Sequence, residues 1–569
     1  MIRIFCKNDQ QYYEVESGTT LLELSAQVCP EAVDPKTGKH YPVIAALVDH
    51  KLKELDFCVF YPHEVEFIGY NHPDGRRTYL RSLCFLLQRA VRTVFPDKVL
   101  VIDHSLPSGQ YCEIVEVELD AKGHTVVYKV SPEELQALKE AMRALVERDC
   151  PFTKVKMLAE EASALFAEQH QYFKAELQRS LGRYFCSVYY LDGVADSFHG
   201  PLVPSAGDLG VFDLMPFHDG FCLQYPSDDD ITRVIPYRRQ DKLAVTLKDY
   251  SKWCETTGIL GVSSLNRKLL AGEAVDLINL SEARQEREYA AVADRIFAER
   301  DRIKIVFLAG PSSSGKTSSA LRLAQQCRVL GLNPKVIELD NYFVSRELTP
   351  KDEDGQYDFE ALGAMDLALL GQHLNALLSG ETVEIPRYDF KLGKPFFEGN
   401  FMHLEENDIL VMEGIHALDP AMVPSVDPRR IFRVYASALT SLNVDENNNI
   451  STTDNRLLRR MVRDNRTRGI TPEETILRWP SVRRGENKYI FPFQENADAQ
   501  FNSALLYELP MLKYYAEPLL RRIHPSSPAY TEAVRLLKFL DYIVALTPQD
   551  IASIPPTSIL REFIGGQTL

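Results

Sequence analysis

The sequence lacks several features that mark particular classes of protein. No stretch of about 18 consecutive apolar residues is present, so a membrane-spanning helix is not expected. The N-terminal residues MIRIFCKNDQ do not have the charged and then apolar layout of a secretory signal. The ten cysteines occur singly and never as C-x-x-C, which argues against a structural zinc site and fits reduced thiols. These absences predict a cytoplasmic protein without a membrane partner.

An excess of positive charge is also absent. Lys and Arg total 64 against 80 for Asp and Glu, which gives a net charge of −16 at pH 7. Broad, nonspecific nucleic-acid binding is therefore not supported, although a local basic groove stays open. The length of 569 residues and the apolar fraction of 45% are those of a globular protein with several domains.

The most specific motif lies past the midpoint, in LAGPSSSGKTSSA at residues 308–320. A glycine, four residues and then Gly-Lys-Thr is the pattern of a loop whose backbone N–H groups cradle phosphate oxygens. An apolar run rich in β-branched residues precedes it and apolar residues at helical spacing follow it, as strand, loop and helix require. The sequence therefore predicts nucleoside triphosphate binding. The residues assigned to it are Gly310, Pro311, Ser312, Ser313, Ser314, Gly315, Lys316, Thr317 and Ser318, with the Thr317 hydroxyl as a Mg²⁺ ligand.

Two acidic residues follow predicted strands further along the chain. Asp340 ends the strand in PKVIELDNYF, where a carboxylate could accept a proton from a substrate hydroxyl; a helix cap or turn is the alternative. Glu413 ends the strand in DILVMEGIHAL and suits a ligand of Mg²⁺; a strand-end acid facing water is the alternative.

The segment NRLLRRMVRDNRTRG predicts a cationic helix. Arg456, Arg460 and Arg463 are spaced i, i+4 and i+7, which places them on one face. Such a face could clamp transferring phosphoryl oxygens, and a solvated charged face is the alternative. We assign Arg463 to catalysis and Arg456 and Arg460 to substrate binding.

These segments, together with EIPRYDF, occur in the order of the uridine/cytidine kinase family within the phosphoribulokinase–uridine kinase group, and residues from roughly 300 to 500 resemble it. The resemblance implies a kinase that uses ATP and Mg²⁺ to phosphorylate the 5′-hydroxyl of a ribonucleoside, with Asp340 as base, Lys316 at the phosphates and Glu413 beside the metal. It assigns Asp366, Tyr388 and Phe390 to the nucleoside pocket and the arginine helix to a lid. Uridine is the first expectation, but the family's base-reading histidine is missing from KLGKPFFEGN, so another nucleoside stays open.

The N-terminal half resembles two modules of threonyl-tRNA synthetase. A predicted hairpin and a helix with Thr20 and Glu23 spaced as a capping box resemble its β-grasp TGS domain. Residues 69–225, including ADSFHGPLVPSAGDLGVFDL, resemble its editing module. The four positions that hold metal or catalytic donors in that module are, in this chain, Arg81, Phe85, Phe198 and Leu202, so we expect neither zinc nor editing.

The expected fold class is therefore multidomain α/β. It comprises a β-grasp domain at 1–68, an α+β editing-like domain at 69–225, a connecting segment and helix at 226–294, and a P-loop kinase with a parallel sheet flanked by helices at 295–569. Two alternatives stay open: a nucleotide-dependent RNA- or ribosome-associated regulator, and a kinase of the same group acting on another metabolite. The absence of a guanine-reading N-K-x-D motif after the loop favours the kinase. A homo-oligomer and RNA binding by the N-terminal half also stay open.

Overall fold

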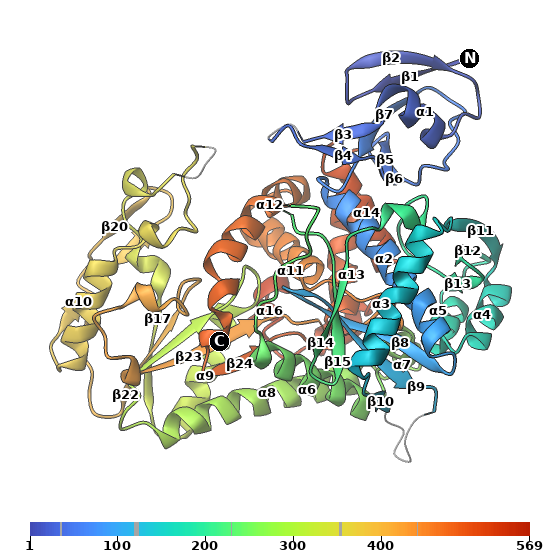
Figure 1. Cartoon of the computed structure of the whole chain (residues 1–569). Coiled ribbons are helices and arrows are strands. Elements are labelled where there is room, and N and C mark those ends of the chain that lie inside the picture. Colours follow the sequence, from blue (N-terminus) through green and yellow to red (C-terminus); the bar gives the residue numbers. More distant parts are fainter. Residues whose placement is uncertain (35–36, 119–124, 229, 352–354, 441) are drawn as a thin grey trace.

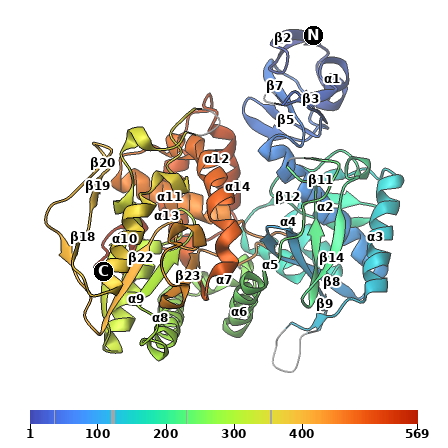
Figure 2. The same cartoon turned by 60° about the vertical axis from the view of Figure 1, so that its left-hand side comes forward.

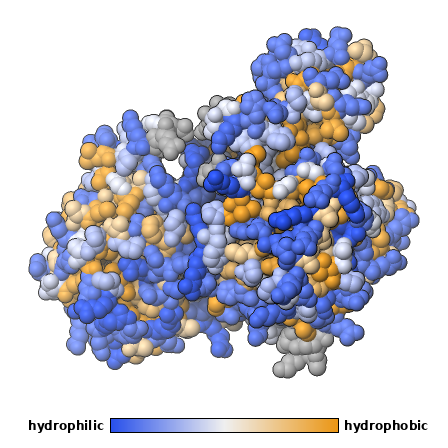
Figure 3. Space-filling view, viewed as in Figure 1, coloured by the Kyte–Doolittle hydropathy of each residue, from blue (hydrophilic) through white to orange (hydrophobic). Residues whose placement is uncertain are grey.

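The computed structural model describes residues 1–34, 37–118, 125–228, 230–351, 355–440 and 442–569. A small N-terminal part stands at the top of Figure 1, a middle part lies at the right, and a larger C-terminal part fills the left and centre. The same arrangement is visible after rotation in Figure 2. Hydrophilic residues cover most of the face in Figure 3. Across the described ranges, no helix is both long and apolar enough to cross a membrane.

The N-terminal part is a five-stranded sheet in the order β2-β1-β7-β5-β6, covered by one helix. The predicted hairpin and helix are both present, and α1 begins with the predicted capping box between Thr20 and Glu23. Strands β1 and β7 are parallel, whereas the other pairs are antiparallel. The elements are β1 (Ile2–Cys6), β2 (Gln11–Val15), α1 (Leu21–Val28), β3 (Glu31–Val33), β4 (His40–Pro42), β5 (Ala45–Val48), β6 (Lys51–Lys53) and β7 (His63–Ile68).

The middle part contains two antiparallel sheets with helices packed against them. One sheet has the order β10-β9-β15-β14, with β8 also paired to β9, and the other has the order β11-β12-β13. The long helix α2 lies against β8 and contributes much of the apolar core. The elements are α2 (Pro73–Val94), β8 (Lys98–Leu106), β9 (Gly109–Glu116), β10 (Val127–Tyr128), α3 (Pro132–Glu147), β11 (Thr153–Leu158), α4 (Ala159–Glu168), α5 (Tyr172–Ser180), β12 (Phe185–Leu191), β13 (Val194–Asp196), β14 (Asp213–Phe217) and β15 (Gly220–Gln224).

The C-terminal part is built on a parallel sheet, as predicted, and its strands have the order β17-β22-β16-β23-β24. Because all five strands run in one direction, the ends of β16, β17 and β22 meet at one edge. The multidomain α/β fold class is confirmed. The elements are β16 (Ile305–Ala309), α9 (Lys316–Val329), β17 (Asn333–Glu338), α10 (Leu367–Leu378), β18 (Val383–Glu384), β19 (Arg387–Asp389), β20 (Lys394–Phe396), β21 (Phe401–Met402), β22 (Asp408–Glu413), β23 (Ile431–Ser437) and β24 (Ala499–Asn502).

Helices from two distant segments share one apolar core beside this sheet. The preceding helix α8 packs along α9, where the Tyr289 hydroxyl donates to the Ser319 hydroxyl at 2.9 Å and Arg322 pairs with Glu286. Helix α8, which lies mostly within the expected connecting segment, therefore packs directly against the first helix after the phosphate loop. The helices are α6 (Asp241–Thr257), α7 (Val262–Leu270), α8 (Ala274–Ala298), α11 (Thr452–Thr467), α12 (Pro472–Tyr489), α13 (Glu508–Leu520), α14 (Tyr530–Leu540), α15 (Pro548–Ala552) and α16 (Arg561–Ile564).

Candidate active site

The loop between β16 and α9 has the backbone of a phosphate cradle. Gly315 precedes α9 with φ +83°, a left-handed conformation that favours glycine. A Cβ on Gly310 would lie 2.0 Å from the Ala436 carbonyl oxygen, so no other residue fits there. The hydroxyls of Ser313 and Ser314 are buried without a hydrogen-bond partner in the described structure. A loop of this shape directs its N–H groups and the start of α9 toward one anion site.

Two predicted site residues meet at the start of α9. The Thr317 hydroxyl donates to Glu413 Oε1 at 2.7 Å, because α9 follows β16 and Glu413 ends the neighbouring strand β22. Lys316 lies beside them and donates to the Pro311 carbonyl at 3.4 Å. Asp340 follows β17, the next strand of the sheet, in a short 3₁₀ turn. A lysine, a hydroxyl and two carboxylates thus gather at one sheet edge.

Burial changes the acidity of both carboxylates. It raises the pKa of Glu413 to about 7, against the opposing effects of the Lys316 charge and the Thr317 hydroxyl. It also raises the pKa of Asp340, again against the charge of Lys316. A carboxylate with a raised pKa is a stronger proton acceptor once it is ionised, and a cation placed between the two would favour their charged forms.

Glu360 is a third acid at this site that the sequence did not indicate. Burial and the charge of Glu486 raise its pKa to about 7, while Lys316 and Arg460 act in the opposite direction. The close contact of Gly485 explains its position, because a Cβ on that glycine would lie 2.8 Å from Glu360 Cγ. Glu360 packs against Gly485 of α12, which is distant in the sequence, so no local sequence pattern could have identified it.

The arginines of α11 fall into two groups. Arg456 and Arg459 are buried: Arg456 pairs with Glu486 and donates to the Ser312 carbonyl at 3.1 Å, and Arg459 pairs with Glu508. Both side chains contact the phosphate loop from α11. Arg456 is only 1% exposed, and this does not fit the predicted contact with substrate. The prediction that Arg456 contacts substrate is therefore corrected. Helical spacing indicates which residues share a face, but not which other elements cover that face.

The second group is placed around Asp464. Arg460 lies 3.3 Å from this carboxylate and also donates to the Ser312 hydroxyl at 2.7 Å. Arg463 lies 2.8 Å from Asp464, and Arg468 lies 3.5 Å from it. Arg460 and Arg463 keep 17% and 15% of their side chains exposed, so they can face a ligand at the loop.

The predicted nucleoside-pocket residues lie on segments next to Asp340. Tyr388 packs edge-on against Phe343 and Phe390, with ring centroids 5.6 and 5.2 Å away. Asp366 caps α10, where its Oδ1 accepts from the Leu369 amide at 2.9 Å. The Asp366 amide in turn donates to the carbonyl of Tyr342, in the turn that holds Asp340, at 2.7 Å. The structure thus brings these residues to the same side of the sheet edge.

The C-terminal residues also contact the phosphate loop. Ser318 is fully buried; its hydroxyl donates to Glu562 at 2.6 Å and accepts from the Gln567 side chain at 2.8 Å. A Cβ on Gly315 would lie 2.3 Å from Ile559 Cδ1. Ser318 was assigned to the nucleotide, and in this structure its hydroxyl binds the C-terminal segment.

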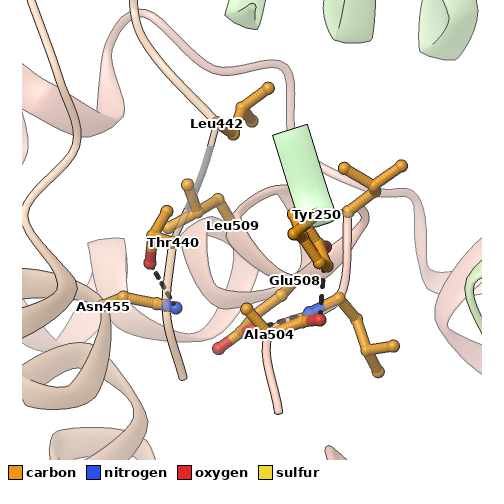
Figure 4. Close-up of a pocket in the computed structure, with 9 residues that line it drawn as sticks. Tyr250, Thr440, Leu442, Asn455, Ala504, Glu508 and Leu509 are labelled. Carbon is orange, nitrogen blue, oxygen red and sulfur yellow. Dashed lines mark hydrogen bonds between the residues drawn. The ribbon is translucent and has the colours of Figure 1, made fainter. Parts of the chain in front are cut away.

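One enclosed space lies close behind α11, and it is far too small for a substrate. Figure 4 shows it between Tyr250, Leu442 and Leu509, with the Asn455 side chain donating to Thr440 at 3.2 Å. Its volume is about 10 Å³, at the lower limit for one water molecule.

In the middle part, the positions that hold metal or catalytic donors in the synthetase editing module form a packed cluster. They are Arg81, Phe85, Phe198 and Leu202. The rings of Phe85 and Phe198 lie 5.4 Å apart, and Leu202 is 2% exposed. Arg81 donates to the Pro201 carbonyl at 2.6 Å. Within the described residues, no group of three His, Cys, Asp or Glu side chains could hold a metal ion.

Comparisons with known proteins find a family that the part of the chain carrying the site resembles. Residues 305–506 match the model of the Phosphoribulokinase / Uridine kinase family. This match spans 202 of the 569 residues, so it is a likeness of this region to that family and not of the whole chain. The matched region contains β16, the phosphate loop, β17, β22 and α11, and all the site residues that the sequence predicted lie within its bounds. A solved structure described as a possible uridine kinase from Bacillus stearothermophilus is 18% identical, with a TM-score of 0.26, and covers 39% of this chain and 99% of that one.

The N-terminal region resembles threonine–tRNA ligases. That of Desulforamulus reducens is 28% identical over 216 residues, which cover 38% of this chain and 31% of the ligase. That of Acidithiobacillus ferrooxidans is 30% identical over 172 residues, which cover 30% of this chain and 25% of the ligase. The chain thus spans less than a third of the length of either ligase.

Proposed function

We propose that the chain is an ATP-dependent nucleoside kinase that transfers the γ-phosphate of Mg-ATP to the 5′-hydroxyl of a ribonucleoside, with uridine as the first candidate. The observation that carries this proposal is the hydrogen bond between Thr317 and Glu413 beside Lys316, one strand away from Asp340. Phosphoryl transfer needs positioned charge and a proton acceptor more than covalent chemistry, and these residues supply both.

In this proposal Lys316 stabilises negative charge on the β- and γ-phosphates, and Asp340 takes the proton of the attacking hydroxyl. Thr317 and Glu413 are the residues suited to hold Mg²⁺, because a hydroxyl and a carboxylate are oxygen ligands and burial disfavours the charge of Glu413 without a nearby cation. Bound Mg²⁺ would neutralise charge on the phosphate oxygens. Arg460 and Arg463 would contact the transferring group.

The substrate side is proposed to consist of Asp366, Tyr388 and Phe390. The Oδ2 atom of Asp366 has no hydrogen-bond partner in the described chain, so it is available for ribose hydroxyls. Asp366 is partly buried. A carboxylate that substrate binding desolvates and leaves without such a partner costs about 1–3 kcal/mol, which corresponds to about one to two decades in favour of ribonucleosides over 2′-deoxynucleosides.

We also propose the modular division of the sequence: a TGS-like part at 1–68, an editing-like part without metal chemistry at 69–225, a connection at 226–294 and the kinase at 295–569. The N-terminal half would regulate or support the kinase. The interlocking of α8 with α9 supports counting this helix with the kinase body.

The test is a comparison of kcat/KM for uridine, cytidine, adenosine, guanosine, inosine and deoxyuridine, with the wild type, Asp340→Asn and Asp427→Asn. Asp340→Asn keeps the shape but cannot accept a proton, so turnover should fall by about 10²–10⁴ with ATP affinity little changed. Asp427→Asn is the matched control, because this acid caps a short 3₁₀ turn away from the loop. Phosphorylation of a different metabolite, with none of these nucleosides accepted, would contradict the nucleoside assignment.

A further inference from the structure

A cavity of about 410 Å³ lies where the N-terminal, middle and C-terminal parts meet. Its walls come from β6, from β11 and β12, from the loop after β13, and from the end of α14. Figure 2 shows α14 beside the middle part and below the N-terminal part. The volume lies within the range of cavities that enclose small-molecule ligands.

The cavity is cationic although the protein as a whole is acidic. Five of its lining side chains are basic and two are acidic, against a net charge of −16 for the chain. Clefts lined by one sign of charge attract ligands of the opposite sign. The basic residues are Lys53, Lys154, Lys156, Arg183 and Lys538, and the acidic residues are Glu54 and Asp541.

Both acidic residues already have partners. Lys154 lies 2.8 Å from Glu54, and Arg183 lies 3.8 Å from Asp541. The other three amines, which come from the three parts of the chain, have no carboxylate within 4.0 Å among the residues that the structure describes. These are Lys53, Lys156 and Lys538.

Two of these amines, those of Lys53 and Lys538, are close enough to repel each other. Burial and the charge of Lys53 lower the pKa of Lys538. Burial also lowers the pKa of Lys53, and Lys154 adds to the effect. An anion bound in the cavity would offset the repulsion between these amines, because an opposite charge favours the protonated form of each amine.

The back wall adds a further cation and neutral polar groups. Arg81 lies directly behind Gly200, where a Cβ would come within 2.6 Å of its Cζ, and it has no carboxylate partner in the described chain. Burial and the charge of Arg81 lower the pKa of His199 to about 3, so this ring is neutral. The hydroxyl of Tyr189 binds Glu54 at the rim.

We propose that this cavity binds a small organic phosphate, with Lys53, Lys156 and Lys538 contacting the phosphate oxygens. Three amines that converge from separate elements suit a group with several anionic oxygens better than a single carboxylate. A small ligand suits the cavity better than a long nucleic acid, because the surrounding surface belongs to a strongly acidic protein. The site is separate from the phosphate loop and does not depend on the nucleoside kinase proposal.

The experiment measures each amine separately. The full chain is acetylated with an amine-reactive reagent in the presence of uridine 5′-monophosphate or inorganic pyrophosphate, and modification is read by mass spectrometry. We expect uridine monophosphate to protect Lys53, Lys156 and Lys538 at least fivefold. Lys252 on α6 is exposed and does not line the cavity, so its modification should not change.

Affinity is measured by calorimetry with Lys538→Gln, Lys156→Gln and the control Lys252→Gln. Each cavity variant should weaken binding about tenfold, as loss of one charged hydrogen bond predicts. Lys316→Ala, which alters the phosphate loop, should leave protection of the cavity amines unchanged. Protection by pyrophosphate alone, protection that disappears in Lys316→Ala, or tighter protection by a short RNA would each overturn the proposal.

Discussion

Lys174 is the strongest test of how the middle part is joined to the kinase-like body. Its side chain is fully buried on α5 and pairs with Asp196. It also lies 3.6 Å from Asp445 and donates to the Asn447 side chain at 3.2 Å; both residues precede α11. The next carboxylate, Glu446, accepts from the backbone amides of Phe173 and Lys174 at 2.7 and 3.2 Å.

The expected loss of stability in Lys174→Met follows from the charges that remain when the lysine is removed. Burial lowers the pKa of Lys174, but the charges of Asp196 and Asp445 outweigh it and the pKa is raised. Burial raises the pKa of Asp196 to about 6 and that of Glu446 to about 7. Lys174→Met keeps the volume and removes the cation, which leaves three carboxyl groups without it. Removing one partner of a buried pair costs about 3–5 kcal/mol, or about 6–20 °C in the midpoint of a domain of 150–250 residues.

The assay is differential scanning calorimetry with urea titration at pH 8 and pH 5. Lys248→Met is the matched control, because Lys248 pairs with Asp219 on the surface and such a pair contributes about 0–1 kcal/mol. The folded pKa values of Asp196 and Glu446 are raised, so their charged forms destabilise the fold as pH increases. The loss in Lys174→Met should therefore be larger at pH 8 than at pH 5. A midpoint within about 2 °C of the control at both pH values would refute this reasoning.

Three further outcomes are expected. Lys316→Ala should abolish phosphoryl transfer without lowering the thermal midpoint, because it removes charge at the phosphates and no core contact; normal turnover would contradict the kinase assignment. Elemental analysis of the full chain should find no stoichiometric zinc, since Phe85 and Phe198 have no donor atoms. Burial raises the pKa of Glu532, but the charges of Arg535 and Arg77 outweigh it and lower the pKa from 4.5 to about 2. Its stabilisation is present above pH 4.5 and is lost as pH falls toward 2, so Glu532→Gln should remove that part of the acid sensitivity in urea titrations.

Local patterns sufficed for the elements around the phosphate loop. The β-branched run before Gly310, the helical spacing after Thr317 and the capping box at Thr20 each depend on residues a few positions apart. The edge that brings Asp340 and Glu413 together also follows from sequence, because both end strands of a parallel sheet. These features needed no knowledge of tertiary packing.

The remaining features depend on partners distant in the sequence. Arg456 and Arg460 share a helix face, yet Glu486 on α12 buries the first and leaves the second beside Ser312. Glu360 packs against Gly485, a residue far along the chain that leaves room for it. The polar run NVDENNNI is typical of an exposed loop, but in this structure most of it is buried against the middle part. Periodicity cannot predict such contacts, because it reports only which residues share a face.

This same polar run links the proposed ligand cavity to the phosphate loop. The Asn448 side chain donates to the carbonyl of Ser197, which lines the cavity, at 3.2 Å, and the run continues into α11. From α11, Arg460 donates to the Ser312 hydroxyl. A chain of contacts between two sites does not by itself create regulation. A ligand shifts the equilibrium between two conformations only as far as its affinities for them differ. The paired charges around Lys174 fasten this polar run to the middle part. We therefore expect any effect of a cavity ligand on phosphoryl transfer to change in Lys174→Met, while the contact between ligand and Lys538 is kept.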